Sequence, residues 1–249
     1  MRITGIIFAL LLGASQCAAI TYERVPRLAA QIEAARADIA NAPEPEHLQR
    51  SIEELVSMVD RTAQRLRGSL APLCATIEAV TCTFSARVAG NDEVNAFLDE
   101  DGVVWVTVSL LQHLETEDEV AAAVAHEVAH RLNGDDIGRA FTASLHQALR
   151  YQLDGSSPAS AASRLSGSAR RLISMEANAD HLAVFLLHRA GYDLEAAERL
   201  WIVLEKIGDR KEAAILATRP YLPERLAAWR LLADKLGRDP HLEPKRIEE

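Results

Sequence analysis

The sequence contains little of what marks fibrous, disordered or nucleic-acid-binding proteins. Only 12 of its 249 residues are glycine and 9 are proline, which excludes collagen-like and mucin-like chains. Acidic residues outnumber basic ones by 36 to 27, for a formal net charge of −9. This argues against a nucleic acid partner, which needs a clustered basic surface. Aromatic residues make up 5%, but 49% of all residues are hydrophobic, so the composition predicts a soluble, mostly helical globular protein built around aliphatic side chains.

Long apolar runs are also missing, apart from a short one at the start of the chain. A positively charged start precedes Ile3–Leu12, and small residues follow up to Ala19. About ten apolar residues are too few for the roughly 30 Å hydrocarbon core of a bilayer. We therefore expect residues 1–19 to be a cleaved signal and the mature protein to be exported, most simply into a bacterial periplasm. A lipidated Cys17 is the alternative, although the preceding Gln16 is not small as a lipobox requires.

Cysteine is scarce, and export changes how the cysteines are interpreted. Without Cys17 only Cys74 and Cys82 remain, in an oxidising compartment where a disulfide between them is expected. Two buried free thiols are the alternative.

The hydrophobic periodicity predicts mostly helices, with a small sheet near the middle. Apolar residues at helical spacing predict helices over about 28–39, 52–66, 117–133, 171–189, 194–207 and 224–237. Short β-branched segments between turn residues predict strands at 76–80, 83–88, 94–98 and 103–108, with a hairpin turn at Asp99–Gly102. We expect residues 20–70 to form a helical extension packed on a domain at 71–249. The Ser-, Ala- and Gly-rich residues 155–168 are either a linker over a cleft or a solvated loop.

The residues that carry chemistry begin with His-Glu-Val-Ala-His at 126–130. Thr116 and Glu119 form a capping box at the start of this predicted helix. His126 and His130 are four residues apart, so both rings can reach one Zn²⁺ from the same helix face. Glu127 lies about 100° round the helix and can act on a zinc-activated water as general base and then general acid.

A third protein ligand is needed for tetrahedral zinc. The metzincin arrangement is excluded, because Asn133 and Asp136 stand where it needs glycine and histidine. Glu176 and Asp180 share a face of a second predicted helix. Glu176 is predicted to be the third ligand, and Asp180 to accept a hydrogen bond from a ligand histidine. This donor set is that of a gluzincin, with one zinc ion per chain as the cofactor.

Several segments stand in the order found in a known family: Val94–Phe97 with the hairpin after it, Val106–Leu111, the His126–His130 helix, Glu176–Asp180 and Ala190–Ala197. Over roughly residues 70–235 the chain resembles the HtpX/prenyl-protein endopeptidase family of zinc peptidases (metallopeptidase family forty-eight), in particular its exported, soluble periplasmic members. The resemblance implies an α+β fold: a mostly helical, zincin-like (gluzincin) metallopeptidase domain with a small antiparallel sheet.

The resemblance also suggests roles for residues outside the metal site. Asn95 and Ala96 are expected on a strand along the cleft that holds the substrate backbone, or else on an ordinary covered strand. Arg225 is a candidate for stabilising the anionic tetrahedral intermediate or for a structural salt bridge. Arg219 stands where the family has histidine, which puts gating of the zinc by that residue in doubt.

Together these patterns predict a zinc metalloendopeptidase that hydrolyses peptide bonds of exported proteins. By analogy with the family, its partners are unfolded or misassembled envelope proteins, and peripheral membrane association is a further possibility. A chaperone-like or scaffold protein with a structural or latent zinc site is one alternative, and a different zinc hydrolase on similar ligands is another.

Overall fold

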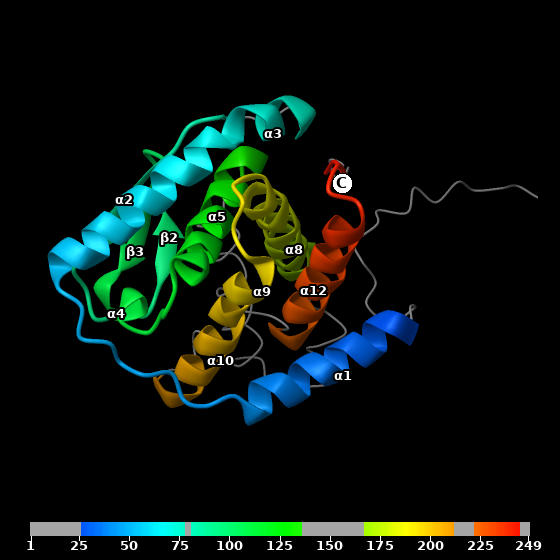
Figure 1. Ribbon diagram of the computed structural model, residues 1–249, viewed down its shortest axis with the longest axis horizontal. Coiled ribbons are helices and arrows are strands. Elements are labelled where there is room, and N and C mark those ends of the chain that lie inside the picture. Colours follow the sequence, from blue (N-terminus) through cyan, green and yellow to red (C-terminus); the bar gives the residue numbers. More distant parts are fainter. Residues whose placement is uncertain (1–25, 78–80, 136–166, 212–221, 245–249) are drawn as a thin grey trace, which may run out of the picture.

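The computed structural model describes residues 26–77, 81–135, 167–211 and 222–244 (Figure 1). Their helices and strands, in chain order, are α1 (Pro26–Asn41), α2 (Ile52–Gly68), α3 (Leu70–Ile77), β1 (Ser85–Ala89), β2 (Ala96–Leu98), β3 (Val103–Thr107), α4 (Val108–Leu111), α5 (Glu117–Asn133), α8 (Gly167–Arg189), α9 (Leu194–Ala197), α10 (Arg199–Lys211) and α12 (Leu222–Arg238). The predicted signal at 1–19, Cys17, Arg219 and most of the 155–168 segment lie outside the described residues. Within the described part, no helix is long and apolar enough to cross a membrane.

Helix α5 lies at the centre of the fold. It packs against α2, β2 and β3 and also against α8, α9 and α10 (Figure 1). Its predicted start is confirmed, because Thr116 and Glu119 form both bonds of a capping box. Its end is set by Gly134, which is left-handed at φ 71° and ψ 30° and leaves Asn133 as the last helical residue. Because α5 is covered on several sides, its polar residues His126, Glu127 and His130 lie in the interior.

The sheet is mixed, whereas the sequence predicted an antiparallel one. Its strand order is β1-β3-β2, with β3 antiparallel to β2 but parallel to β1. The predicted turn joins β2 and β3: the Gly102 N–H donates to the Asp99 carbonyl at 3.0 Å, and Gly102 has a φ of 80°. Turn residues specify only such neighbours in sequence, so they gave no sign that β1 pairs in parallel with β3.

Several predicted elements differ from those observed. The strand at 76–80 is wrong for its described residues, because Thr76 and Ile77 end α3. The α3 side chains that lie buried have helical spacing: Leu70, Leu73, Cys74 and Ile77. The predicted helix 194–207 is divided at Glu198 into α9 and α10. The predicted strand 103–108 ends at Thr107, because the Thr107 hydroxyl accepts a hydrogen bond from the Leu110 N–H and caps α4.

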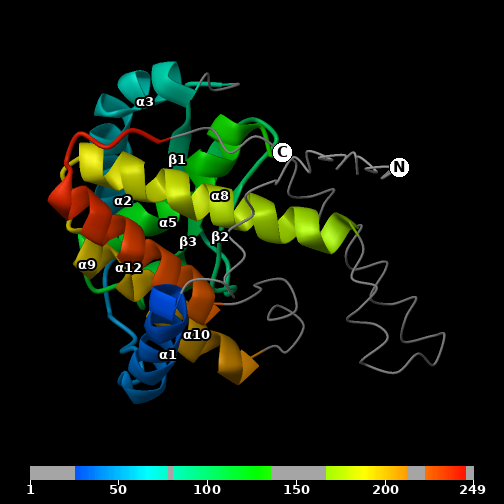
Figure 2. The same ribbon diagram turned by 90° about the vertical axis from the view of Figure 1, so that its right-hand side faces the viewer.

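The first helix of the described chain packs against the last. Helix α1 contacts α12, and α12 in turn contacts α8 (Figure 2). The side chains of α1 that lie buried repeat at helical spacing: Leu28, Ile32, Ala35 and Ile39. Two ion pairs flank them, from Arg36 to Glu224 at 3.1 Å and from Arg230 to Asp38 at 2.6 Å. The division of the chain at residue 70 stays a prediction.

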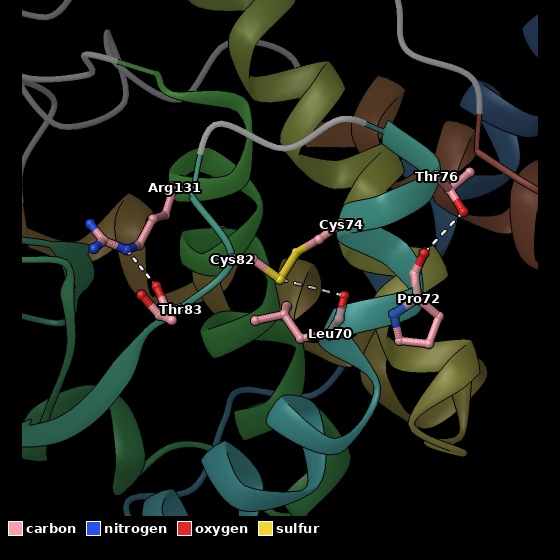
Figure 3. Close-up of a disulfide and its surroundings, with 7 residues drawn as sticks. All are labelled: Leu70, Pro72, Cys74, Thr76, Cys82, Thr83 and Arg131. Carbon is pink, nitrogen blue, oxygen red and sulfur yellow. Dashed lines mark hydrogen bonds between the residues drawn. A yellow bond between two sulfur atoms is a disulfide. The ribbon is translucent and has the colours of Figure 1, made fainter.

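A disulfide joins Cys74 in α3 to Cys82, just before β1 (Figure 3). The next residue, Thr83, accepts a hydrogen bond through its carbonyl from Nε of Arg131 in α5, at 2.6 Å. The disulfide therefore lies one residue from a contact with the central helix.

Candidate metal centre

Two packed helices bring three possible metal ligands together. His126 and His130 lie one turn apart on α5, and Glu176 faces them from α8, a helix that packs along α5. The two Nε2 atoms are 3.1 Å apart. Oε2 of Glu176 lies 3.3 Å from Nε2 of His126, and Oε1 lies 3.5 Å from Nε2 of His130. Within the described ranges, these residues form the one group of three or more His, Cys, Asp and Glu side chains whose donor atoms all lie within 4.8 Å of one another.

A carboxylate lies beside the other nitrogen of each histidine ring. Oδ1 of Asp180 is 2.9 Å from Nδ1 of His126, and Oδ2 of Asp135 is 2.9 Å from Nδ1 of His130. An ionised carboxylate can only accept a hydrogen bond, so in a neutral His130 ring the proton belongs on Nδ1. The contact of His126 with Asp180 has the distance of an ion pair but not the alignment of a hydrogen bond. Nε2 of His130 then directs a lone pair toward the same region as Nε2 of His126 and the carboxylate of Glu176.

This arrangement fits a zinc ion. Three electron-pair donors that face one another at such short distances repel unless positive charge lies among them. In a tetrahedral site with zinc bonds of about 2.0–2.1 Å, neighbouring donors are separated by roughly 3.3 Å, close to the three separations observed. Two imidazole nitrogens and a carboxylate are also donors that zinc prefers.

The charged groups around these donors shift their pKa values against the effect of burial. Burial opposes protonation of His130, but its hydrogen bonds with Asp135 and Glu176 outweigh that effect and raise its pKa to about 10. Burial likewise opposes protonation of His126, yet contacts with Asp180 and Glu176 raise its pKa. Burial favours the neutral acid at Glu176, but the charge of Arg225 and the two histidines hold its pKa well below the usual value.

Arg225, on α12, lies behind the carboxylates. Its Nε and Nη2 donate to the two carboxylate oxygens of Asp180 at 2.6 and 2.8 Å, and Nη1 lies 3.1 Å from Glu176. Its guanidinium carbon is 4.3 Å from the ring centre of Trp201, whose ring meets that of His126 edge to face. Of the two roles that the sequence left open for Arg225, the structure shows a salt bridge; contact with a reaction intermediate stays a prediction.

The remaining predicted residues lie on α5 itself and at the start of β2. Glu127 follows His126 on α5 and is only 9% exposed, and its negative charge contributes to the raised pKa of His130. Asn95 directly precedes β2, with its backbone N–H 3.1 Å from the Thr107 hydroxyl. Ala96 begins β2, which packs on α5 and is an edge strand of the sheet that the described ranges form. Substrate binding by Asn95 and Ala96 stays a prediction.

Asp135 is the residue near the metal ligands that the sequence interpretation missed. A local signal was present, because Gly134 directly follows the predicted helix 117–133. A left-handed glycine at a helix end turns the chain back over the last turn, so an acidic side chain just after it lies near the second histidine. The position of Trp201 beside His126 has no such local signal, because α10 and α5 are far apart in the sequence.

Comparison with known proteins supports the family resemblance that the sequence motifs suggested. A sequence model of peptidase family M48 matches residues 60–233. The chain is 29% identical over 149 residues to mitochondrial metalloendopeptidase OMA1 of Arabidopsis thaliana, an alignment that covers 59% of this chain and 31% of that protein. It is 26% identical over 224 residues to the beta-barrel assembly-enhancing protease of Escherichia coli (strain K12), covering 75% of this chain and 45% of that protein.

The alignments thus span less than half the length of each of these relatives. The family match, in contrast, covers most of this chain, including both histidines, Glu127, Glu176, Asp180 and Arg225. The chain therefore belongs to peptidase family M48.

Proposed function

We propose that this protein is a zinc-dependent endopeptidase, with one zinc ion held by His126, His130 and Glu176. The observation that carries the proposal is the convergence of these donors from α5 and α8 at separations of 3.1 to 3.5 Å. Membership of peptidase family M48 and similarity to proteins named as proteases support it. A bound zinc ion supplies Lewis acidity, which polarises a peptide carbonyl and makes water more acidic.

The chain's own residues then have distinct tasks. Glu127, buried next to His126 on α5, removes a proton from the attacking water and delivers it to the leaving amine. Asp180, whose Oδ1 lies 2.9 Å from Nδ1 of His126, favours a proton on that nitrogen and leaves Nε2 as the donor. Strand β2, an edge strand among the described residues, binds an extended substrate by adding it as a further strand, with Asn95 and Ala96 at its start.

We further propose that the substrates are unfolded or misassembled envelope proteins and that the protein works after export, in the periplasm. Two observations support this. Relatives in Yersinia pestis and Escherichia coli are named beta-barrel assembly-enhancing protease, and the sequence opens with the pattern of a secretory signal.

The test combines metal analysis with proteolysis. We expect the purified protein to contain one zinc per chain and to cleave unfolded casein in a chelator-sensitive manner. Glu176→Ala should lose the metal. Glu127→Gln should keep it while cleavage falls about 100- to 10,000-fold, the usual contribution of a general acid–base group.

The outcomes separate the proposal from its alternatives. Full activity of Glu127→Gln would contradict the mechanism, and a wild-type protein without zinc would contradict the metal site. Bound zinc with no cleavage of any protein would favour a scaffold protein. Cleavage of small esters or amides but not of proteins would favour a different zinc hydrolase.

A further inference from the structure

Asp135, just after the end of helix α5, contacts His130 twice, once through its backbone and once through its side chain. Gly134 adopts a left-handed conformation, and its N–H donates to the Arg131 carbonyl at 3.2 Å. The following N–H, that of Asp135, donates to the carbonyl of His130 at 3.0 Å. This turn reverses the chain and keeps the backbone of Asp135 against the last turn of the helix.

The side chain of Asp135 makes the second contact with His130. Its Oδ2 lies 2.9 Å from Nδ1 of His130, and the two side chains are 15% and 1% exposed. Nδ1 and Nε2 lie on opposite sides of an imidazole ring. Asp135 therefore touches the side of the ring that faces away from Glu176 and His126, and it is not a ligand of an ion held among them.

We propose that Asp135 is the positioning residue of His130, and that the glycine turn at the end of α5 is what places it there. The proposal rests on the metal site proposed above. A carboxylate on Nδ1 fixes the tautomer and the ring orientation and makes Nε2 a stronger donor, and loss of such a partner typically weakens metal binding about 10- to 100-fold.

The two histidines are thereby oriented from different parts of the chain. Asp180 reaches His126 from α8 and is itself held by Arg225 of α12. Asp135 reaches His130 from the end of α5 itself. The orientation of His130 thus depends on a local turn, whereas that of His126 depends on the packing of α5, α8 and α12.

The test measures metal affinity, which does not depend on turnover. The zinc dissociation constant of the metal-stripped protein is measured against a chromophoric chelator. We expect it to rise about 10- to 100-fold in Asp135→Ala and by a smaller factor in Asp135→Asn, which keeps an acceptor oxygen but loses the charge. Asp60→Asn, a matched change at an exposed position of α2, should keep the wild-type constant.

Two further measurements distinguish positioning from a general loss of structure. In the Co²⁺-loaded protein, the visible absorption bands should shift in Asp135→Asn and not in Asp60→Asn. Gly134→Ala should raise the zinc dissociation constant while Asp135 itself is intact, because alanine is strained at a φ of 71°.

The failures can be told apart. A wild-type protein that binds no zinc overturns the proposed function and this inference with it. If the wild-type protein binds zinc, but Asp135→Ala leaves the zinc dissociation constant unchanged and Asp135→Asn leaves the cobalt spectrum unchanged, only the inference is overturned.

Discussion

Arg225 neutralises two carboxylates that lie deep in the protein. It makes a two-bond ion pair with Asp180, a third contact with Glu176, and stacks on Trp201. The side chains of Arg225 and Asp180 are 6% and 7% exposed, so water screens this pair little. Removal of one partner of a buried pair leaves an uncompensated charge, which costs more than the pair itself contributes.

We expect Arg225→Met to lower the free energy of unfolding by about 3–5 kcal/mol. The measurement is urea denaturation in the presence of a chelator, so that bound metal does not contribute. Arg238→Met is the matched control, because Arg238 lies on the same helix with a side chain that is 58% exposed. Equal stability of the two variants would show that the ion pair is not a main support of the site.

At the scale of helices and strands, the disulfide joins α3 to the segment that enters β1. The two cysteines are separated by 8 positions, and closing a loop of this size in the unfolded chain corresponds to about 2–3 kcal/mol. The carbonyl of Thr83, next to Cys82, also holds Arg131 of α5.

We expect reduction by dithiothreitol to lower the stability of the wild-type protein by about 2–3 kcal/mol, measured as a shift of the urea midpoint. A double variant, Cys74→Ser with Cys82→Ser, should be less stable from the start and insensitive to dithiothreitol. A wild-type midpoint that dithiothreitol leaves unchanged would contradict a stabilising disulfide.

The same elements show which features the sequence could predict. Helix α5 was predicted with its observed bounds because its signals are local: a capping box at Thr116 and Glu119, and a glycine just after its end. Both histidines and Glu176 were singled out for a related reason, since the helical spacing of metal ligands is a short-range pattern.

Features that depend on distant contacts were not predicted. The parallel pairing of β1 with β3 and the stacking of Trp201 beside His126 join segments that no local pattern relates. The β-branched residues around Thr76 suggested a strand, but burial of Leu73, Cys74 and Ile77 against the core favours a helix there. The position of Asp135 could have been predicted, because a glycine that reverses the chain at position 134 brings the next side chain near His130.

At the scale of the whole molecule, the first helix of the described chain packs on the last, which carries Arg225. Helix α1 precedes the region matched by the family model, which begins at residue 60. It packs on α12, the helix that carries Arg225. The ion pair from Arg36 reaches Glu224, the residue just before Arg225.

We expect Ile32→Ala, at a buried position of α1, to lower the free energy of unfolding by about 2–5 kcal/mol. It should also weaken zinc binding, because α12 loses part of its support. Glu33→Ala, at the neighbouring exposed position, is the control and should change both quantities little. Urea denaturation and the zinc titration described above measure the two effects; unchanged zinc affinity in a destabilised Ile32→Ala would show that α1 supports the fold but not the site.

Zinc itself should stabilise the folded protein as a whole. Glu176 and Asp180 lie beside one guanidinium, that of Arg225, and Asp135 adds a third carboxylate on the outer nitrogen of His130, so a divalent cation among the donors is favoured by this negative charge. Zinc at a hundredfold excess over its dissociation constant adds about 2.7 kcal/mol of stability. We expect the melting temperature to rise with zinc in the wild-type protein and to stay constant in Glu176→Ala, as followed by circular dichroism.

The distribution of the ligands along the chain also determines when metal can enter. The histidines lie on α5, Glu176 on α8, and the arginine that holds Glu176 on α12. A polypeptide emerges from the ribosome or from a secretion channel in order from its N-terminus, so the ligand set is incomplete until α8 has emerged and packed on α5. For the proposed zinc site we therefore expect metal binding to be coupled to the packing of α8 on α5. The ions present where the chain folds would then compete for the site.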